Sequence, residues 1–198
     1  IGIAWRSPQG AALLGFPGLK AMLGGGVAKV QFAVNAGMFH LGGAPVGLFV
    51  SASAQERSLN RRSGPGNFHL LPNGVFWVDR KGRARVDTTE AFAKRGAKPV
   101  LATQSGPMLL IAGQLHPQFQ DDGPSKLIRN GVGETWNGGA VFAISETPVS
   151  FGKMARFFRD SLPVRDALYL DGSVSSLWEP STGRMDIRAP LGPMIWVY

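Results

Sequence analysis

SFGKMARFFRDSLPVRDALYLDGS, residues 150–173, predicts a helix that turns back into a buried strand. Ser150 can cap the helix, because its hydroxyl can accept a hydrogen bond from a backbone N–H of the first turn. The apolar residues on one helical face are Phe151, Met154, Ala155, Phe158 and Leu162. Pro163 ends the helix, since proline lacks the N–H that a helix needs. The apolar run Ala167–Leu170 then predicts a buried strand that ends at Asp171.

Pairs of apolar segments joined by glycine-containing turns predict hairpins outside this stretch. The strongest turn signal is Asn73-Gly74 between Phe68–Leu71 and Val75–Asp79, because both turn positions favour residues that tolerate positive φ. Further hairpins are expected over residues 108–116, 131–145 and 177–187. Single strands are expected over 29–34, 46–51 and 84–86.

Two other short helices are expected. Pro17–Leu23 begins with a proline in its first turn and is followed by glycines. Asp87 and Glu90 have the spacing of a capping box, and the helix that they begin would end at Gly96. The pattern predicts an α+β fold with a mainly antiparallel mixed sheet, many hairpins and two or three short helices.

Composition places the 198 residues in a single globular domain, residues 1–198. Hydrophobic residues make up 44% and charged residues 17% of the chain, which excludes a wholly disordered protein. Glycine (27) and proline (14) are abundant, which favours many turns over a long-helix bundle. The absence of cysteine excludes disulfides and thiolate metal sites, and no apolar run is long enough to span a bilayer.

The formal net charge of +8 favours an anionic partner. The basic residues are dispersed, and their nearest approach to a cluster is Arg80–Arg85 on an expected turn. No motif of the common nucleic-acid-binding modules is present, so a nucleic-acid partner is not expected.

Four segments share a pattern in which a strand runs into glycine and small polar residues. They are Asn35–Phe39, Gln104–Pro107, Arg129–Gly133 and Asp171–Ser176. Glycine lets backbone amides approach a ligand, and Asn, Gln, Ser and Arg suit hydroxyl-rich or phosphate-bearing ligands. Each segment alone is more typical of a turn whose polar groups satisfy the local backbone than of a binding site. Their recurrence favours a site in which all four meet.

Other site types have little support. His40, His69 and His116 lack metal-ligand spacing, so no metal site and no cofactor are expected, although a cation held by Asp171 and main-chain oxygens stays open. No Gly-x-Ser-x-Gly motif is present around Ser173.

The four segments, in this order and spacing, resemble the hallmark segments of the phosphodiester glycosidase family, to which the lysosomal uncovering enzyme belongs. The resemblance runs from about Trp5 to the end of the chain and is greatest to a bacterial, predicted periplasmic branch, in which stretches such as Asn73–Phe76 and Phe157–Asp160 also look similar. It implies an exported protein that cleaves a sugar C1–O–phosphate bond in a glycan or sugar-phosphate substrate. One departure is Ser173, where many members have a second glycine after Asp-Gly.

The resemblance also implies which residues form the pocket. It carries over Asn35, Gly37, Ser105, Gly106, Arg129, Gly131, Asp171, Gly172 and Ser175. Their neighbours His40, Gln104, Asn130 and Ser173 complete the candidate substrate-binding set.

A phosphate leaving group needs little protonation, since its second pKa is about 6. One carboxylate and a phosphate clamp could therefore suffice where ordinary glycosidases use two carboxyl groups. Asp171 is the expected nucleophile or general base and Arg129 the expected clamp, with Glu146 and then Glu134 as reserve carboxylates.

Two rival functions stay open. A binding module could hold an anionic envelope glycan on aromatic platforms such as Trp136 or Trp178. A nuclease-like phosphodiesterase would usually require a metal ion. An enzyme requires Asp171 within reach of the same pocket as Arg129, with room for a reactive carbon between them, whereas a binding module requires only an open basic groove.

Overall fold

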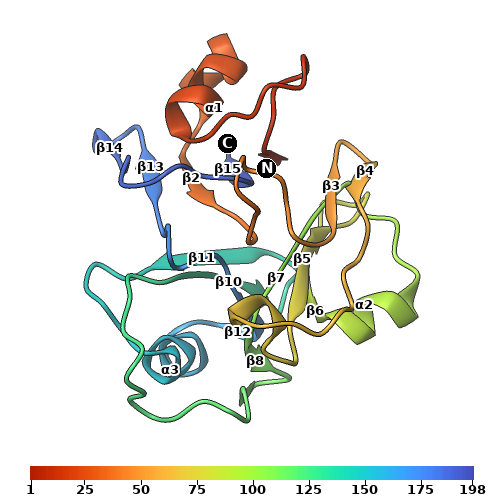
Figure 1. The fold of residues 1–198 in the computed structure, drawn as a ribbon, viewed down its shortest axis with the longest axis vertical. Helices are drawn as coiled ribbons and strands as arrows, with labels where there is room; N and C mark the ends of the chain where they lie inside the picture. The colour runs from red at the N-terminus through yellow and green to blue at the C-terminus, as the bar shows by residue number, and fades with distance from the viewer.

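The computed structural model describes residues 1–198, the whole sequence given. Three α-helices, α1 (Phe16–Leu23), α2 (Thr89–Arg95) and α3 (Phe151–Ser161), lie around three five-stranded sheets (Figure 1). Two short 3₁₀ helices, Gly24–Lys29 and Asn67–His69, complete the regular structure. Every strand pairing is antiparallel, which confirms the predicted α+β class with mostly sheet.

The first sheet joins the two ends of the chain (Figure 1). Its strand order is β1 (Gly2–Ala4), β15 (Met194–Val197), β2 (Phe32–Asn35), β13 (Leu177–Glu179) and β14 (Arg184–Met185). In its register Asn35, the last residue of β2, lies opposite Met194. The sheet thereby fixes the end of β2 from which the first polar segment begins.

The second sheet contains the strand of the helix–strand unit over residues 150–173. Its order is β11 (Ala140–Ile144), β10 (Asn130–Thr135), β12 (Val164–Tyr169), β8 (Met108–Ile111) and β9 (Gln114–Leu115). Gly131 at the start of β10 lies opposite Tyr169 at the end of β12. The antiparallel register therefore brings Asn130 and Asp171 to the same end of these two neighbouring strands.

The third sheet contributes the remaining polar segment. Its order is β4 (Ala54–Arg57), β3 (Phe49–Ser51), β7 (Leu101–Ser105), β5 (Gly74–Val78) and β6 (Ala84–Thr88). Ser105, the last residue of β7, lies opposite Gly74. The β7–β8 connection then crosses from this sheet to the second one within Gly106 and Pro107.

One core holds the three sheets together. A single cluster of buried apolar side chains includes Val34 from the first sheet, Leu168 from the second and Phe76 from the third. Apolar burial of this extent is the main stabilising term in folding. Polar strand ends that meet at this junction therefore sit on a rigid base.

Most expected elements are present, with two corrections. Phe68–Leu71 is not a strand, because Asn67–His69 forms a 3₁₀ turn and β5 pairs with β6 and β7 instead. The cap of α2 is Thr88, whose Oγ1 accepts from the Ala91 amide, and Asp87 is instead bound by Arg95. Ser150 caps α3 as expected, accepting from the Lys153 amide.

None of the helices has both the length and the apolar character needed to cross a bilayer.

Candidate active site

Two asparagines from different sheets form the centre of the site. Asn130 donates from Nδ2 to the backbone oxygen and to Oδ1 of Asn35, at 3.1 and 3.0 Å. Both side chains are about 99% buried. Buried amides of this kind must be hydrogen-bonded, so the pair ties the end of β2 firmly to the start of β10.

The same pair fixes the segment that follows β12. Asn35 donates from Nδ2 to the Asp171 carbonyl oxygen at 2.8 Å and accepts from the Ser176 amide at 2.9 Å. Ser175 donates from Oγ to Asn130 Oδ1 at 3.1 Å. We call Asn35, Asn130, Ser175 and the backbone of 171–176 the asparagine network. Three of the four predicted segments are thus joined by direct hydrogen bonds.

Asp171 projects from the asparagine network as a half-buried carboxylate. Its amide donates to the Ala36 carbonyl oxygen at 3.2 Å, which fixes its backbone. Its Oδ1 accepts from the amide and the hydroxyl of Ser173, at 3.2 and 2.7 Å. Its Oδ2 makes no hydrogen bond within the protein, and no cation pairs with the carboxylate. Asp171 is therefore oriented through one oxygen and free to act through the other.

The remaining segment, around Ser105, lies against the first segment and against the end of β12. Gly37 donates from its amide to Thr103 Oγ1 at 3.1 Å, and a Cβ at Gly37 would collide with the Gln104 carbonyl oxygen. The Pro107 carbonyl oxygen accepts from the Tyr169 amide. A glycine is required where two backbones approach this closely. The Ser105 hydroxyl is fully buried and has no hydrogen-bond partner in the structure.

Gln104 lies in the same segment but faces away from this junction. Its Oε1 accepts from the amides of Leu48 and Asn60, and its Nε2 donates to Asn60 O and Thr89 Oγ1. All four hydrogen-bonding positions of the amide are used within the protein. Gln104 therefore anchors the loop around Asn60, and no position is left for a ligand.

Arg129 does not occupy the place expected of a phosphate clamp. Its side chain is 0% exposed, and its guanidinium donates to Val149 O, Ser125 O and the Tyr169 hydroxyl, each at 2.8 Å. It also stacks on the Phe151 ring at 3.6 Å. Burial lowers the pKa of Arg129. The prediction that Arg129 binds a leaving phosphate does not agree with this burial, because no atom of the side chain reaches solvent.

Arg129 instead acts on the Asp171–Gly172 turn indirectly, through its hydrogen bond to the Tyr169 hydroxyl. The Tyr169 hydroxyl lies against the Gly172 backbone amide, so closely that a Cβ at Gly172 would collide with it. Burial raises the pKa of Tyr169 to about 12, with the Arg129 charge opposing the rise and the Asp171 charge adding to it. Gly172 is thus required because the Tyr169 hydroxyl occupies the space of its side chain. Sequence patterns did not single out Tyr169, although it lies two residues before Asp171 on the same strand.

The reserve carboxylates lie elsewhere. Glu146 is exposed and forms an ion pair with Arg184 at 2.6 Å. Glu134 lies four residues from Asn130 on β10, about 13 Å away at the rise of a strand. It accepts from the Val86 amide and pairs with Arg85, and burial raises its pKa. Neither carboxylate contacts the asparagine network.

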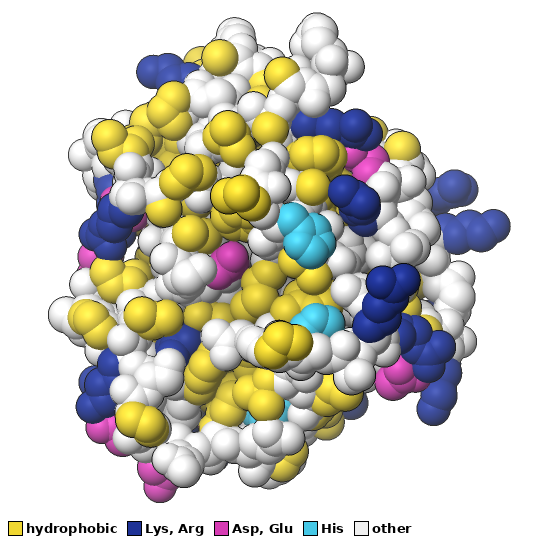
Figure 2. All heavy atoms as spheres, viewed as in Figure 1, with side chains coloured by type: hydrophobic (Ala, Val, Ile, Leu, Met, Phe, Trp, Pro, Cys, Tyr) yellow, Lys and Arg dark blue, Asp and Glu magenta, His cyan; other side chains and the backbone are white.

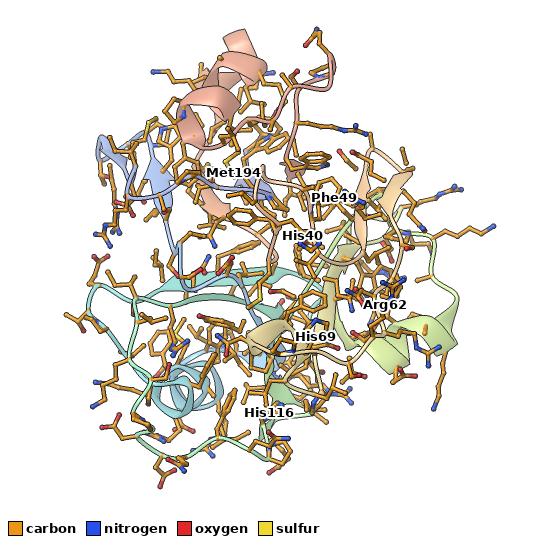
Figure 3. All side chains as sticks on the ribbon, viewed as in Figure 1. His40, Phe49, Arg62, His69, His116 and Met194 are labelled. Carbon is orange, nitrogen blue, oxygen red and sulfur yellow. The ribbon has the colours of Figure 1, made fainter.

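The other predicted residues are divided between the core and the surface. Gly131 is buried, and a Cβ there would lie 3.0 Å from the Leu168 carbonyl oxygen. His40 and Ser173 are exposed. Of the two aromatic platforms considered for a binding module, Trp136 is exposed but Trp178 is buried against Phe16 in the core. In the shared view of Figures 2 and 3, His40 and His69 border a hollow in the middle of one face.

Comparisons with known proteins define the class. The whole chain superimposes on 72% of the catalytic domain of zebrafish N-acetylglucosamine-1-phosphodiester alpha-N-acetylglucosaminidase, auto-inhibited by its pro-peptide, with a TM-score of 0.65 and 16% identity. The fold is therefore that of a glycosidase catalytic domain. A sequence model of phosphodiester glycosidases matches residues 28–194, and the chain belongs to the phosphodiester glycosidase family.

A further relative is a protein of Escherichia coli (strain K12) described as the uncharacterized protein YigE. It is 40% identical over 152 residues, which make up 76% of this chain. The chain spans 58% of the length of that relative.

Proposed function

We propose that this protein hydrolyses the glycosidic bond of a sugar-1-phosphodiester, with Asp171 as the only carboxylate that takes part. The proposal is supported by membership of the phosphodiester glycosidase family and by the surroundings of Asp171. The observation that carries it is the half-buried carboxylate whose Oδ1 is held by Ser173 and whose Oδ2 has no partner. An oriented carboxylate with one free oxygen suits a nucleophile or a general base.

The leaving group explains how one carboxylate can suffice. A bond forms to C1 from Asp171 or from a water that gives its proton to Asp171. The C1–O bond to the phosphodiester breaks, and its electron pair stays on the oxygen of the departing phosphate monoester. The second pKa of such a phosphate is about 6, so it departs as an anion without a general acid. In the first case, water then hydrolyses the glycosyl ester and restores the carboxylate.

The sugar that we propose to test first is N-acetylglucosamine. The zebrafish enzyme whose fold this chain shares is named for N-acetylglucosamine-1-phosphodiesters. The asparagine network is buried, so we propose that it supports the sugar indirectly, by holding the Asp171–Ser176 segment in position. We further propose an exported, periplasmic protein, as the sequence resemblance implies.

The test compares the wild-type protein with Asp171→Asn on a panel of sugar-1-phosphodiesters, with and without chelator. We expect free sugar and a phosphate monoester from the wild type, and a loss of turnover in Asp171→Asn of about 100-fold or more. Asp122→Asn, at a surface aspartate, serves as the matched control.

Three outcomes would contradict the proposal. Near-normal turnover by Asp171→Asn would remove Asp171 from the reaction. Release of sugar phosphate in place of free sugar, abolished by chelator, would indicate a metal-dependent phosphodiesterase. Binding of the phosphodiester without any turnover by the wild type would support the binding module instead.

A further inference from the structure

A cleft that contains His40, five residues along the chain from Asn35, is lined by three arginines. It has a volume of about 250 Å³, and its polar lining consists of His40, Arg57, Ser58, Asn60, Arg61 and Arg62. No Asp or Glu lines it. We call these residues the arginine cleft. Its volume is slightly below that of a typical pocket for a drug-sized molecule, so it suits a small anionic group.

Two of the three arginines have no carboxylate partner. Arg61 is held by Glu90 through two hydrogen bonds, at 3.0 and 2.6 Å. Arg57 and Arg62 form no ion pair, whereas ten ion pairs engage cations outside the cleft. A guanidinium without a carboxylate presents a planar fork of donors that matches a phosphate group. Figure 2 shows Lys and Arg side chains gathered on this side of the face, where Figure 3 labels Arg62.

The backbone of the cleft is fixed, although its side chains are exposed. Gln104 binds both the amide and the carbonyl oxygen of Asn60. Asn60 in turn accepts at Oδ1 from the Arg62 amide, at 3.0 Å, and donates from Nδ2 to Val46 O. The Arg62 carbonyl oxygen lies 2.8 Å from His69 Nδ1. A prearranged backbone lowers the entropy cost of binding, so two exposed arginines on it can hold an anion.

A second cleft on the other side of Asn60–Arg62 is less suitable. It has a volume of about 320 Å³ and contains Glu90, which takes up the charge of Arg61. A carboxylate in the lining repels an anion. Arg62 lines both clefts, but only the cleft that contains His40 lacks a carboxylate in its lining.

The arginine cleft is connected to the candidate active site by two segments of chain. His40 ends the stretch that begins at Asn35, and Gln104, which anchors the cleft, precedes Ser105. Asp171 repels an anion, and the buried Arg129 cannot reach one. Cations would favour a phosphodiester at Asp171, and the arginine cleft contains two that no carboxylate pairs.

We propose that Arg57 and Arg62 bind the phosphate of the substrate in the arginine cleft, which places the sugar C1 toward Asp171. The proposal rests on the proposed function for the identity of the ligand, but the binding of a phosphate anion is independent of any turnover. Gln104 is a positioning residue of this subsite, acting through Asn60.

The first experiment measures equilibrium binding of inorganic phosphate to the full chain by calorimetry, at ionic strength matched with sodium chloride. We expect saturable binding by the wild type. The affinity of the double variant Arg57→Ala/Arg62→Ala for phosphate should be at least about tenfold lower, since hydrogen bonds to a charged group are lost. The control is Arg80→Ala, which removes an exposed arginine without an ion pair from outside the cleft and should bind phosphate as the wild type does.

The second experiment separates this inference from the proposed function. On a sugar-1-phosphodiester, the double variant should raise KM, while turnover of an uncharged aryl glycoside of the same sugar should not change. Failure of the wild type to bind phosphate, or equal phosphate binding by the wild type and the double variant, would overturn the subsite whatever the activity. Phosphate binding that is lost in the double variant would support the subsite even if no glycosidase activity were found.

Discussion

Arg129 donates a hydrogen bond from Nη1 to the Tyr169 hydroxyl at 2.8 Å, and neither side chain is exposed to solvent. No carboxylate neutralises the guanidinium, whose other partners are carbonyl and hydroxyl oxygens of Val149 and Ser125. The cost of burying this charge is offset by several charge-assisted hydrogen bonds and by stacking on Phe151. The pair therefore supports the Asp171–Gly172 turn from inside the protein.

Replacing Arg129 should reduce stability strongly. Arg129→Met keeps much of the side-chain volume but leaves Val149 O, Ser125 O and the Tyr169 hydroxyl without their donor. Buried polar groups without partners cost about 1 to 3 kcal/mol each, so the free energy of unfolding should fall by about 3 kcal/mol. Urea denaturation measures the change. Arg80→Met, at an exposed arginine, should stay within about 0.5 kcal/mol of the wild type, and an equally small effect at Arg129 would show that its contacts are not stabilising.

Gly172→Ala should be destabilising because its Cβ would overlap the Tyr169 hydroxyl. We expect a loss of about 2 kcal/mol in the free energy of unfolding, the usual scale of overpacking. Gly25→Ala is the matched control, since a Cβ at Gly25 meets no atom within 4 Å.

A double variant identifies the contact responsible for that loss. Tyr169→Phe removes the hydroxyl and should relieve part of the overlap with Ala at position 172. The combined loss in Gly172→Ala/Tyr169→Phe should therefore be smaller than the sum of the single losses by about 1 kcal/mol. Strict additivity would mean that Tyr169 does not constrain Gly172.

Tyr169 should lose its proton only in strong alkali. Burial raises its pKa to about 12 from the usual tyrosine value of 10.0. The chain has two tyrosines, so Tyr198→Phe isolates the absorbance change of Tyr169 at alkaline pH. We expect a midpoint near pH 12 while circular dichroism shows the protein to be folded. A midpoint near 10 would mean that the hydroxyl is solvated.

The same shift has a defined sign for stability. Between pH 10 and 12 the folded state keeps the Tyr169 proton and the unfolded state loses it, so the folded state binds more protons. Stability therefore falls as pH rises through this window, by up to about 2 to 3 kcal/mol. Tyr169→Phe should remove this part of the alkaline loss.

Asn35 and Asn130 should be energetically coupled. Asn35→Ala and Asn130→Ala each leave buried hydrogen-bonding groups of the other side chain without partners, so each should cost about 2 kcal/mol. The double variant should lose less than the sum by about 1 kcal/mol, because the second change removes groups already left without partners. Asn35→Ala combined with Asn137→Ala, in an exposed turn, should be additive and serves as the control. Additivity within the Asn35–Asn130 pair would contradict the asparagine network.

The sequence is sufficient to predict the α+β class, the helix α3 with its Ser150 cap, and the meeting of the four polar segments. These depend on local periodicity, on capping, and on the tendency of polar residues at strand ends to meet. Residues 68–71 were misassigned because the apolar character of a 3₁₀ turn that packs on the core resembles that of a strand. The strands β1 and β15 were missed because each finds its partner almost 200 residues away, beyond any local pattern.

The direction in which each side chain points is harder to predict from sequence than the strands and helices. The burial of Arg129 depends on contacts with Ser125 and Val149 in two loops and with Tyr169 in β12, and the Arg129–Gly133 motif does not indicate them. The fixed loop around Asn60 depends on Gln104, 44 residues away. The roles of Asp171 and of the substrate-binding residues stay predictions.

Ser173 should set the rate of the proposed reaction by orienting Asp171. Its hydroxyl donates to Asp171 Oδ1 at 2.7 Å from an exposed position, so Ser173→Ala removes the bond without disturbing the core. A hydrogen bond to a charged group contributes about 1.5 kcal/mol or more, which corresponds to about a tenfold fall in kcat with KM little changed. Ser173→Thr keeps a hydroxyl and should recover most of the rate on a sugar-1-phosphodiester, whereas equal losses in the Ala and Thr variants would show that the effect comes from the backbone of the turn.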